Sequence, residues 1–147
     1  MMYSVPIIIL TLGLILLFFI PKRLSIKEVY NTWTAIALLT VLTDLIVGAV
    51  FDKFDFAGSK KIQLSDLFFE ITITPVYGII LLCLMPESKV RFLITSLLWT
   101  VIGISIEWLN VMVGYLDYKG WSLWYSIPFY FATCYFLRWH LWFLRRG

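Results

Sequence analysis

The chain has 147 residues, of which 61% are hydrophobic and only 14% are charged. A soluble domain carries about 25% charged residues, and a small domain leaves much of its surface in water. The composition therefore excludes an ordinary soluble core and indicates a protein that uses the bilayer as its solvent. The net charge of +3 does not indicate nucleic-acid binding, because the twelve Lys and Arg residues are scattered at the ends of apolar segments.

Five apolar runs follow one another along the chain, at residues 5–20, 32–51, 66–84, 92–116 and 121–144. A transmembrane helix needs about 20 mostly apolar residues. The first run is followed, not preceded, by basic residues, the reverse of a secretory signal peptide. We expect an all-α bundle of five transmembrane helices forming a single domain over residues 1–147, or four spans if the first helix is interfacial.

The basic residues also predict the orientation of these helices. With the N-terminus outside and the C-terminus inside, the inner segments hold eight Lys and Arg residues and the outer segments hold four. Positive charge is enriched on the cytoplasmic side of membrane proteins. We therefore expect an N-out, C-in protein of the cell membrane with several spans, whose surroundings are membrane lipids.

Three carboxylates interrupt the apolar runs: Asp44, Glu70 and Glu107. Asp44 lies seven residues before Phe51, Glu70 lies four after the start of its run, and Glu107 lies seven before Gly114. At a rise of about 1.5 Å per residue, each lies roughly 6–11 Å below the outer surface. An acid inside a span costs about 2.5–3.5 kcal/mol, which favours a position facing protein or water. This convergence predicts an outward-facing acidic site.

Helical spacing supplies neighbours for these acids. Glu107 and Asn110 share one stripe of the fourth helix, whereas Glu70 shares a stripe with Tyr77 on the third. We predict a ligand-binding set with Glu107 as the primary acid and Asn110 and Tyr77 as neutral partners. The whole set comprises Asp44, Glu70, Tyr77, Glu107, Trp108 and Asn110. The outer lysines Lys53, Lys60, Lys61 and Lys119 are candidate counter-charges, and Ser122, Tyr125, Ser126, Phe129 and Thr133 form a facing stripe on the fifth helix.

Other chemistry finds little support. His140 is the single histidine, so one subunit has no pair of histidines for haem. The nucleophile elbow, zinc-protease and phosphate-loop motifs are absent from the sequence. We expect no cofactor and no metal. Cys83 and Cys134 lie within predicted spans and are expected to be free thiols.

Three functions remain open. The first is an intramembrane site that binds or passes a proton, a cation or a small polar or cationic ligand, in a chain that needs a homo-oligomer to form a conducting path. The second is a structural or partner subunit, in which the carboxylates only specify helix packing; Asp66 and Glu70 then act as N-terminal acids of the third helix. The third is an intramembrane lipid-modifying enzyme with a carboxylate as general acid. Because no catalytic motif is present, a protein that is not an enzyme is the preferred interpretation.

Several stretches together resemble one protein family. They are Ile106-Glu107-Trp108, Gly114-Tyr115, residues 120–126 (Gly-Trp-Ser-Leu-Trp-Tyr-Ser), Leu137-Arg138-Trp139-His140, Thr43-Asp44-Leu45 and the segment from Glu70 to Pro75. The resemblance is to a family of small multi-pass membrane proteins of spore-forming Gram-positive bacteria that has no established function, and it covers residues 31–140. The chain departs from that pattern at Thr43, where glycine is expected before Asp44, and at Trp139. The resemblance implies a membrane location and implies no mechanism.

Overall fold

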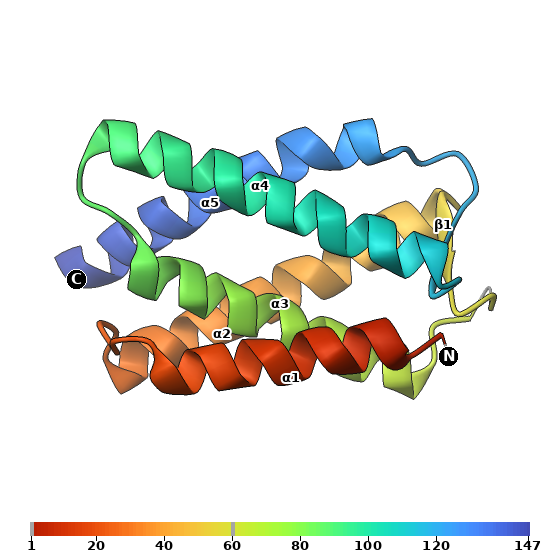
Figure 1. Ribbon diagram of the computed structural model, residues 1–147, viewed down its shortest axis with the longest axis horizontal. Helices are drawn as coiled ribbons and strands as arrows, with labels where there is room; N and C mark the ends of the chain where they lie inside the picture. Colours follow the sequence, from red (N-terminus) through yellow and green to blue (C-terminus); the bar gives the residue numbers. More distant parts are fainter. Residues whose placement is uncertain (1, 60) are drawn as a thin grey trace.

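The computed structural model describes residues 2–59 and 61–147, and within these residues the fold is a bundle of five helices (Figure 1). They are α1 (Ser4–Phe19), α2 (Ile26–Asp44), α3 (Leu64–Leu84), α4 (Lys89–Met112) and α5 (Leu123–Arg146), and α2 continues as the short π-helix η1 (Leu45–Val50). The prediction of an all-α fold with five helices is confirmed. The chain termini lie at opposite ends of the bundle, which we call the N-terminal end and the C-terminal end (Figure 1).

Three helical segments are long and apolar enough to cross a membrane: Ile26–Val50, Leu64–Leu84 and Lys89–Met112. The other two predicted spans differ in length or composition. With 16 residues, α1 is only about 24 Å long, against a hydrocarbon core of about 30 Å. The 24 residues of α5 include three Trp and three Tyr, together with Arg138 and His140, which lower its mean hydropathy. That α1 and α5 also cross the membrane, which would give five spans, therefore stays a prediction.

The central helix is α3, which packs against α1, α2 and α5. Between Val76 and Cys83 every residue except Tyr77 is buried, as expected for a helix that is apolar all round. Two glycines allow neighbouring helices to approach it. A Cβ atom at Gly78 would lie 2.3 Å from the Ile36 side chain of α2, and one at Gly13 of α1 would lie 2.9 Å from the Tyr77 ring.

Capping residues explain why α2 and α3 begin earlier than the apolar runs predict. The Ser25 side chain accepts a hydrogen bond from the Glu28 N–H, and the Glu28 carboxylate accepts one from the Ser25 N–H. Gln63 and Asp66 form the same reciprocal arrangement at the start of α3. Side chains that satisfy the first N–H groups stabilise a helix start. The hypothesis that Asp66 and Glu70 cap the third helix is therefore confirmed for Asp66 alone, because Glu70 lies beyond the first turn and interacts with Asp44.

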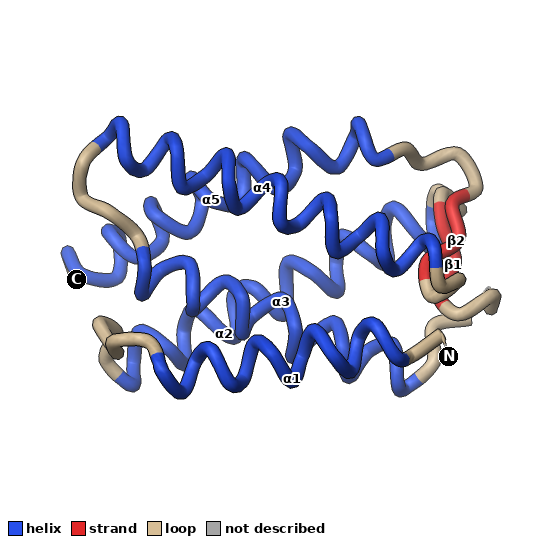
Figure 2. The backbone as a smooth tube through the Cα atoms, viewed as in Figure 1, coloured by secondary structure: helices blue, strands red, loops and turns tan. Residues whose placement is uncertain are grey.

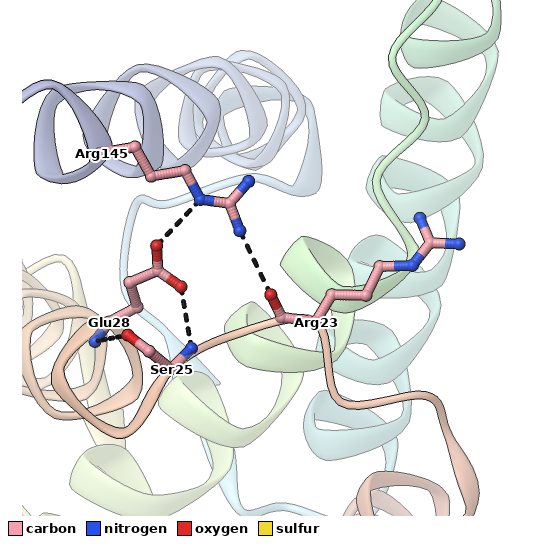
Figure 3. A network of polar contacts seen from close by, with 4 residues as sticks. All are labelled: Arg23, Ser25, Glu28 and Arg145. Carbon is pink, nitrogen blue, oxygen red and sulfur yellow. Dashed lines mark hydrogen bonds and ion pairs between the residues drawn. The ribbon is translucent and has the colours of Figure 1, made fainter.

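The first of these caps also connects distant parts of the chain at the C-terminal end (Figure 3). Arg145 of α5 donates from Nε to Glu28 Oε1 at 2.8 Å and from its guanidinium to the Arg23 carbonyl at 3.2 Å. The last turn of α5 is thereby attached to the connection between α1 and α2.

A two-stranded antiparallel sheet closes the N-terminal end (Figure 2). Strand β1 (Phe54–Phe56) pairs with β2 (Leu116–Tyr118), and Phe54 lies opposite Tyr118. Lys119 reinforces this pairing through ion pairs to Asp52 at 2.9 Å and Asp55 at 2.6 Å. The sheet was not predicted, but it joins two loops far apart in sequence and fixes the residues between α4 and α5.

Candidate functional site

The carboxylate of Glu107 is held by three hydroxyl groups. Ser126 donates to Oε1 at 2.7 Å, Tyr118 donates to the same oxygen, and Tyr130 donates to Oε2 at 2.8 Å. The Trp121 indole N–H donates to the Ser126 hydroxyl at 2.8 Å, which extends the network by one step. Donors from β2 and α5 thus converge on one acid of α4, so the network connects three elements.

Glycine at position 103 makes part of this network possible. Gly103 precedes Glu107 by one helical turn, so both residues lie on the same face of α4. A Cβ atom at Gly103 would lie 2.9 Å from the Tyr130 ring. The missing side chain lets that ring lie against the α4 backbone, where its hydroxyl reaches Glu107.

Asp44 and Glu70 form a second acidic centre, between α2 and α3. Their carboxyl groups lie close enough to interact electrostatically with each other. Glu107 lies within electrostatic range of Asp44. The predicted convergence of three carboxylates from three helices is therefore present, but it consists of a pair and a separate single acid.

The surroundings of the pair contain buried oxygens that lack hydrogen-bond partners among the described residues. They are Asp44 Oδ2, Asp66 Oδ1 and the Tyr115 hydroxyl. Asp66 is 0% exposed and Tyr115 is 4% exposed. Burial, and then the nearby acids Glu70 and Asp66, raise the pKa of Tyr115. A buried oxygen without a hydrogen-bond partner costs about 1–3 kcal/mol, so these three oxygens make this region energetically unfavourable as it stands.

A small cavity adjoins Asp44 toward the N-terminal end. Its volume is about 10 Å³, close to the space of one water molecule. Asp44 lines it together with Asp55 and Ser59 of the loop between η1 and α3. The cavity therefore brings the half-buried Asp44 next to polar residues of that loop.

Aromatic side chains cover the same end. The Tyr115 ring lies 5.7 Å from the Tyr3 ring, 5.7 Å from the Phe56 ring and 6.3 Å from the Phe69 ring, measured between centroids. Phe54 continues the layer from Phe56 to Trp121. These rings form a continuous aromatic layer, which we call the aromatic cap.

The helix geometry changes next to the pair. Directly after Asp44 the chain widens into η1, in which the Phe51 N–H bonds to the Ile46 carbonyl five residues earlier. Gly48 in this turn leaves room for the Phe54 ring, which lies 3.1 Å from the position of an added Cβ. Single π-helical turns occur frequently at functional sites. Here the turn forms one wall of the cavity beside Asp44.

The remaining predicted residues lie apart from this pair. Tyr77 donates to the Ile9 carbonyl at 2.9 Å and so attaches α1 to α3. Trp108 is 50% exposed, which places it on the outside of the bundle. Asn110 has a buried Oδ1 without a hydrogen-bond partner among the described residues. The binding roles predicted for these three residues stay predictions.

The candidate counter-charges also take other positions. Lys119 pairs with Asp52 and Asp55 in the loops, and these hydrogen bonds raise the pKa of its ammonium group. Lys60 lies outside the described residues. The acidic pair therefore has no basic partner of the kind proposed from the sequence, within the part of the chain that the structure describes.

Sequence reasoning missed most of the donors to Glu107. Ser126 was expected on a facing stripe of α5, but Tyr118 and Tyr130 were not assigned to the site. The spacing of Ser126 and Tyr130, four residues apart, was the available signal on α5. For Tyr118 the signal was weaker, because its position depends on strand pairing between two short loops. In the sequence, Tyr118 and Tyr130 also look like the neighbouring Tyr and Trp residues of the expected aromatic belt.

Fold and site together define a small all-α protein with three helices able to cross a membrane and a hydrogen-bonded acidic interior. Comparisons with protein-family models, curated proteins and solved structures each found no match. The family resemblance described above therefore stays a prediction. Within the described residues, no three His, Cys, Asp or Glu side chains lie close enough together to hold a metal ion.

Proposed function

We propose that this protein is a multi-pass protein of the cell membrane whose Asp44–Glu70 pair binds a proton, or a small cation in its place, from the outer side. The N-terminal end faces outward in this proposal and the C-terminal end faces the cytoplasm, as the distribution of Lys and Arg favours. All five helices span the membrane, with α1 tilted little because it is short.

The observation that carries the proposal is the proximity of two carboxyl groups inside the bundle. Like charges this close do not both ionise in a low dielectric, so in this proposal the pair holds one exchangeable proton. Asp44 lines the small cavity, and its Oδ2 has no hydrogen-bond partner among the described residues. Asp44 is therefore the residue of the pair that a proton or cation from outside reaches first.

A second function is favoured by Glu107. The Glu107 carboxylate accepts three hydrogen bonds, and these allow it to act as a packing centre that joins α4, β2 and α5. A structural or partner subunit, assembled with itself or with another membrane protein, would need no exchange at the Asp44–Glu70 pair. In the first proposal, proton conduction by a chain of this size also needs a homo-oligomer. The binding function and the structural function therefore differ in whether the Asp44–Glu70 pair exchanges a proton, and not in whether the protein assembles.

The test is an infrared titration of the full-length protein reconstituted in lipid bilayers. We expect the C=O band of a protonated carboxyl group at neutral pH, lost in Asp44→Asn/Glu70→Gln and retained in Glu87→Gln, a matched change of an exposed acid at the other end. In vesicles, a pH-sensitive dye and added Na⁺ or K⁺ then report whether protons or cations exchange.

Absence of a protonated-carboxyl band in the native protein, or an unchanged band in the double variant, would remove the proposal. A band that never responds to external pH or to cations would leave only the packing function. Cation-dependent loss of the band would identify the pair as a shared site for protons and cations.

A further inference from the structure

At the C-terminal end, a groove about 430 Å³ in volume lies between α4 and α5. Its lining combines two basic residues with aromatic rings: Lys89, Phe92, Tyr135, Arg138, Trp139 and Trp142. The volume falls in the range of sites for small ligands, about 300–1,000 Å³. The groove is far from the acidic pair of α2 and α3, because the pair lies toward the N-terminal end of the bundle and the groove lies at the C-terminal end.

Arg138 is fixed in this groove. Its guanidinium lies 4.3 Å from the centre of the Phe92 ring and donates to the Glu87 carbonyl at 3.1 Å. Phe92 is 1% exposed and also packs against Tyr135, so the stacking surface is rigid. Arginine has five N–H donors, and most of them remain available for an anion.

The start of α4 adds positive potential beside Arg138. Lys89 is the first residue of the helix, the Ser88 side chain accepts no hydrogen bond there, and the first turn holds no acidic residue. The positive end of the helix dipole therefore acts together with Lys89. Among the described residues, neither Lys89 nor Arg138 forms an ion pair, although Glu87 is close in sequence.

The outer wall of the groove is apolar and open. Tyr135, Trp139 and Trp142 are 45%, 54% and 51% exposed, so their rings face the surroundings of the bundle. Tryptophan and tyrosine prefer the level of lipid headgroups, and basic pockets between transmembrane helices bind anionic headgroups. The bond from Arg138 to the loop carbonyl of Glu87 places the guanidinium near the helix ends, at that level.

We infer that this groove binds the phosphate of an anionic phospholipid in the leaflet at the C-terminal end. Lys89 and Arg138 hold the phosphate, and the acyl chains lie along Tyr135 and Trp139. In the orientation proposed above this is the cytoplasmic leaflet, but the site depends only on the groove and does not require the proton-binding function.

Native mass spectrometry of the full-length protein in detergent, titrated with phosphatidylglycerol or phosphatidylcholine, tests the inference. We expect selective retention of phosphatidylglycerol. Each lost charge should weaken it roughly fivefold, in Lys89→Gln and in Arg138→Gln. The control is Lys22→Gln, which removes the same charge from an exposed position at the same end and should bind normally.

Equal affinity for both lipids, or an equal loss in Lys22→Gln, would overturn the site. Inorganic phosphate that displaces the lipid at matching concentration would reassign the groove to free anions. If Arg138→Gln fails to fold, Lys89→Gln decides the outcome, because Lys89 is exposed and is the first residue of α4. Unchanged phosphatidylglycerol affinity in that variant contradicts the inference.

Discussion

Glu107 and the Asp44–Glu70 pair lie toward the same end of one bundle, yet their oxygens have opposite surroundings. Glu107 accepts hydrogen bonds from three hydroxyl groups on two other elements. Asp44 and Glu70 have each other, and Asp44 Oδ2 has no partner among the described residues. One carboxylate is therefore satisfied by fixed donors, whereas the pair leaves an acceptor open.

The difference shows that depth in a helix does not by itself assign a role to an acid. A carboxylate with enough fixed donors holds the surrounding elements in place. In the function proposed above, the carboxyl pair without such donors takes up a proton or a cation. The number and origin of donors thus separate a packing acid from an exchanging acid, and substitutions at the two centres should have different effects.

The largest effect should come from Glu107→Leu. This change removes the shared acceptor of Tyr118, Ser126 and Tyr130 and leaves three hydroxyl groups without their partner. We expect the free energy of unfolding to fall by about 3 kcal/mol, since a polar group left without its hydrogen-bond partner costs about 1 kcal/mol or more. Unfolding in mixed micelles measures this loss.

The comparison predicts a much smaller effect of Asp44→Asn. The new amide can donate to Glu70, so the contact survives without the shared proton, and the loss should stay below about 1 kcal/mol. A loss as large as that of Glu107→Leu would mean that both centres serve packing, and the distinction between them would fail.

An effect between those of Glu107→Leu and Asp44→Asn is expected for Gly103→Ala, which tests how Tyr130 reaches Glu107. Replacing glycine by alanine in a helix ordinarily stabilises it by about 1 kcal/mol. Here the added methyl group would lie 2.9 Å from a ring whose hydroxyl is held by Glu107. Overpacking should reverse the sign and cost about 1–2 kcal/mol in the same unfolding measurement.

Two further variants isolate that contact. Ser105→Ala, on an exposed position of the same helix, should change stability little. In a Tyr130→Leu background the smaller, unbonded side chain can move, so the penalty of Gly103→Ala should disappear. A penalty that persists there would place the strain elsewhere in α4.

Much of the fold was predictable because bilayer-scale apolar runs leave few alternatives. The five helices follow the five runs, and the end of α4 near Gly114 follows from that glycine, whose φ is +78°. Errors occurred where polar residues extend a helix: α2 begins at Ile26, six residues before its apolar run, because Ser25 and Glu28 cap it. The number of membrane spans does not follow from the number of helices, because α1 and α5 differ in length or hydropathy from the three helices that can cross a membrane.

The candidate site was predictable in part. Periodicity and depth brought Asp44, Glu70 and Glu107 to one level, since both depend only on helix geometry. The positions of the hydroxyl donors to Glu107 depend on tertiary contacts, which helical periodicity in the sequence does not predict. Tyr118 is positioned by a three-residue strand, and Tyr130 by space left at Gly103 on another helix.

The smallest predicted effect is an alkaline loss of stability centred on Tyr118. Burial, and then the hydrogen bond to Glu107, raise the pKa of this phenol above its usual value. Because the folded-state pKa is raised, the stabilisation is complete below the unfolded pKa of about 10 and is lost as pH rises above it. Half a pH unit above the unfolded pKa, the loss of stability should be about 0.8 kcal/mol for this phenol.

Thermal unfolding and phenolate absorbance, measured together from neutral pH to about pH 11, separate the loss of stability caused by Tyr118 ionisation from general base denaturation. In Tyr118→Phe the stability should start lower, by about 1 kcal/mol for the lost hydrogen bond, and then depend less on pH. Tyr125→Phe, which changes an exposed tyrosine at the same end, is the matched control and should keep the native pH dependence. If Tyr118→Phe and Tyr125→Phe respond alike, the Tyr118 hydroxyl is not a fixed donor. Glu107 would then have fewer fixed donors, and the contrast with the open Asp44–Glu70 pair would be weaker.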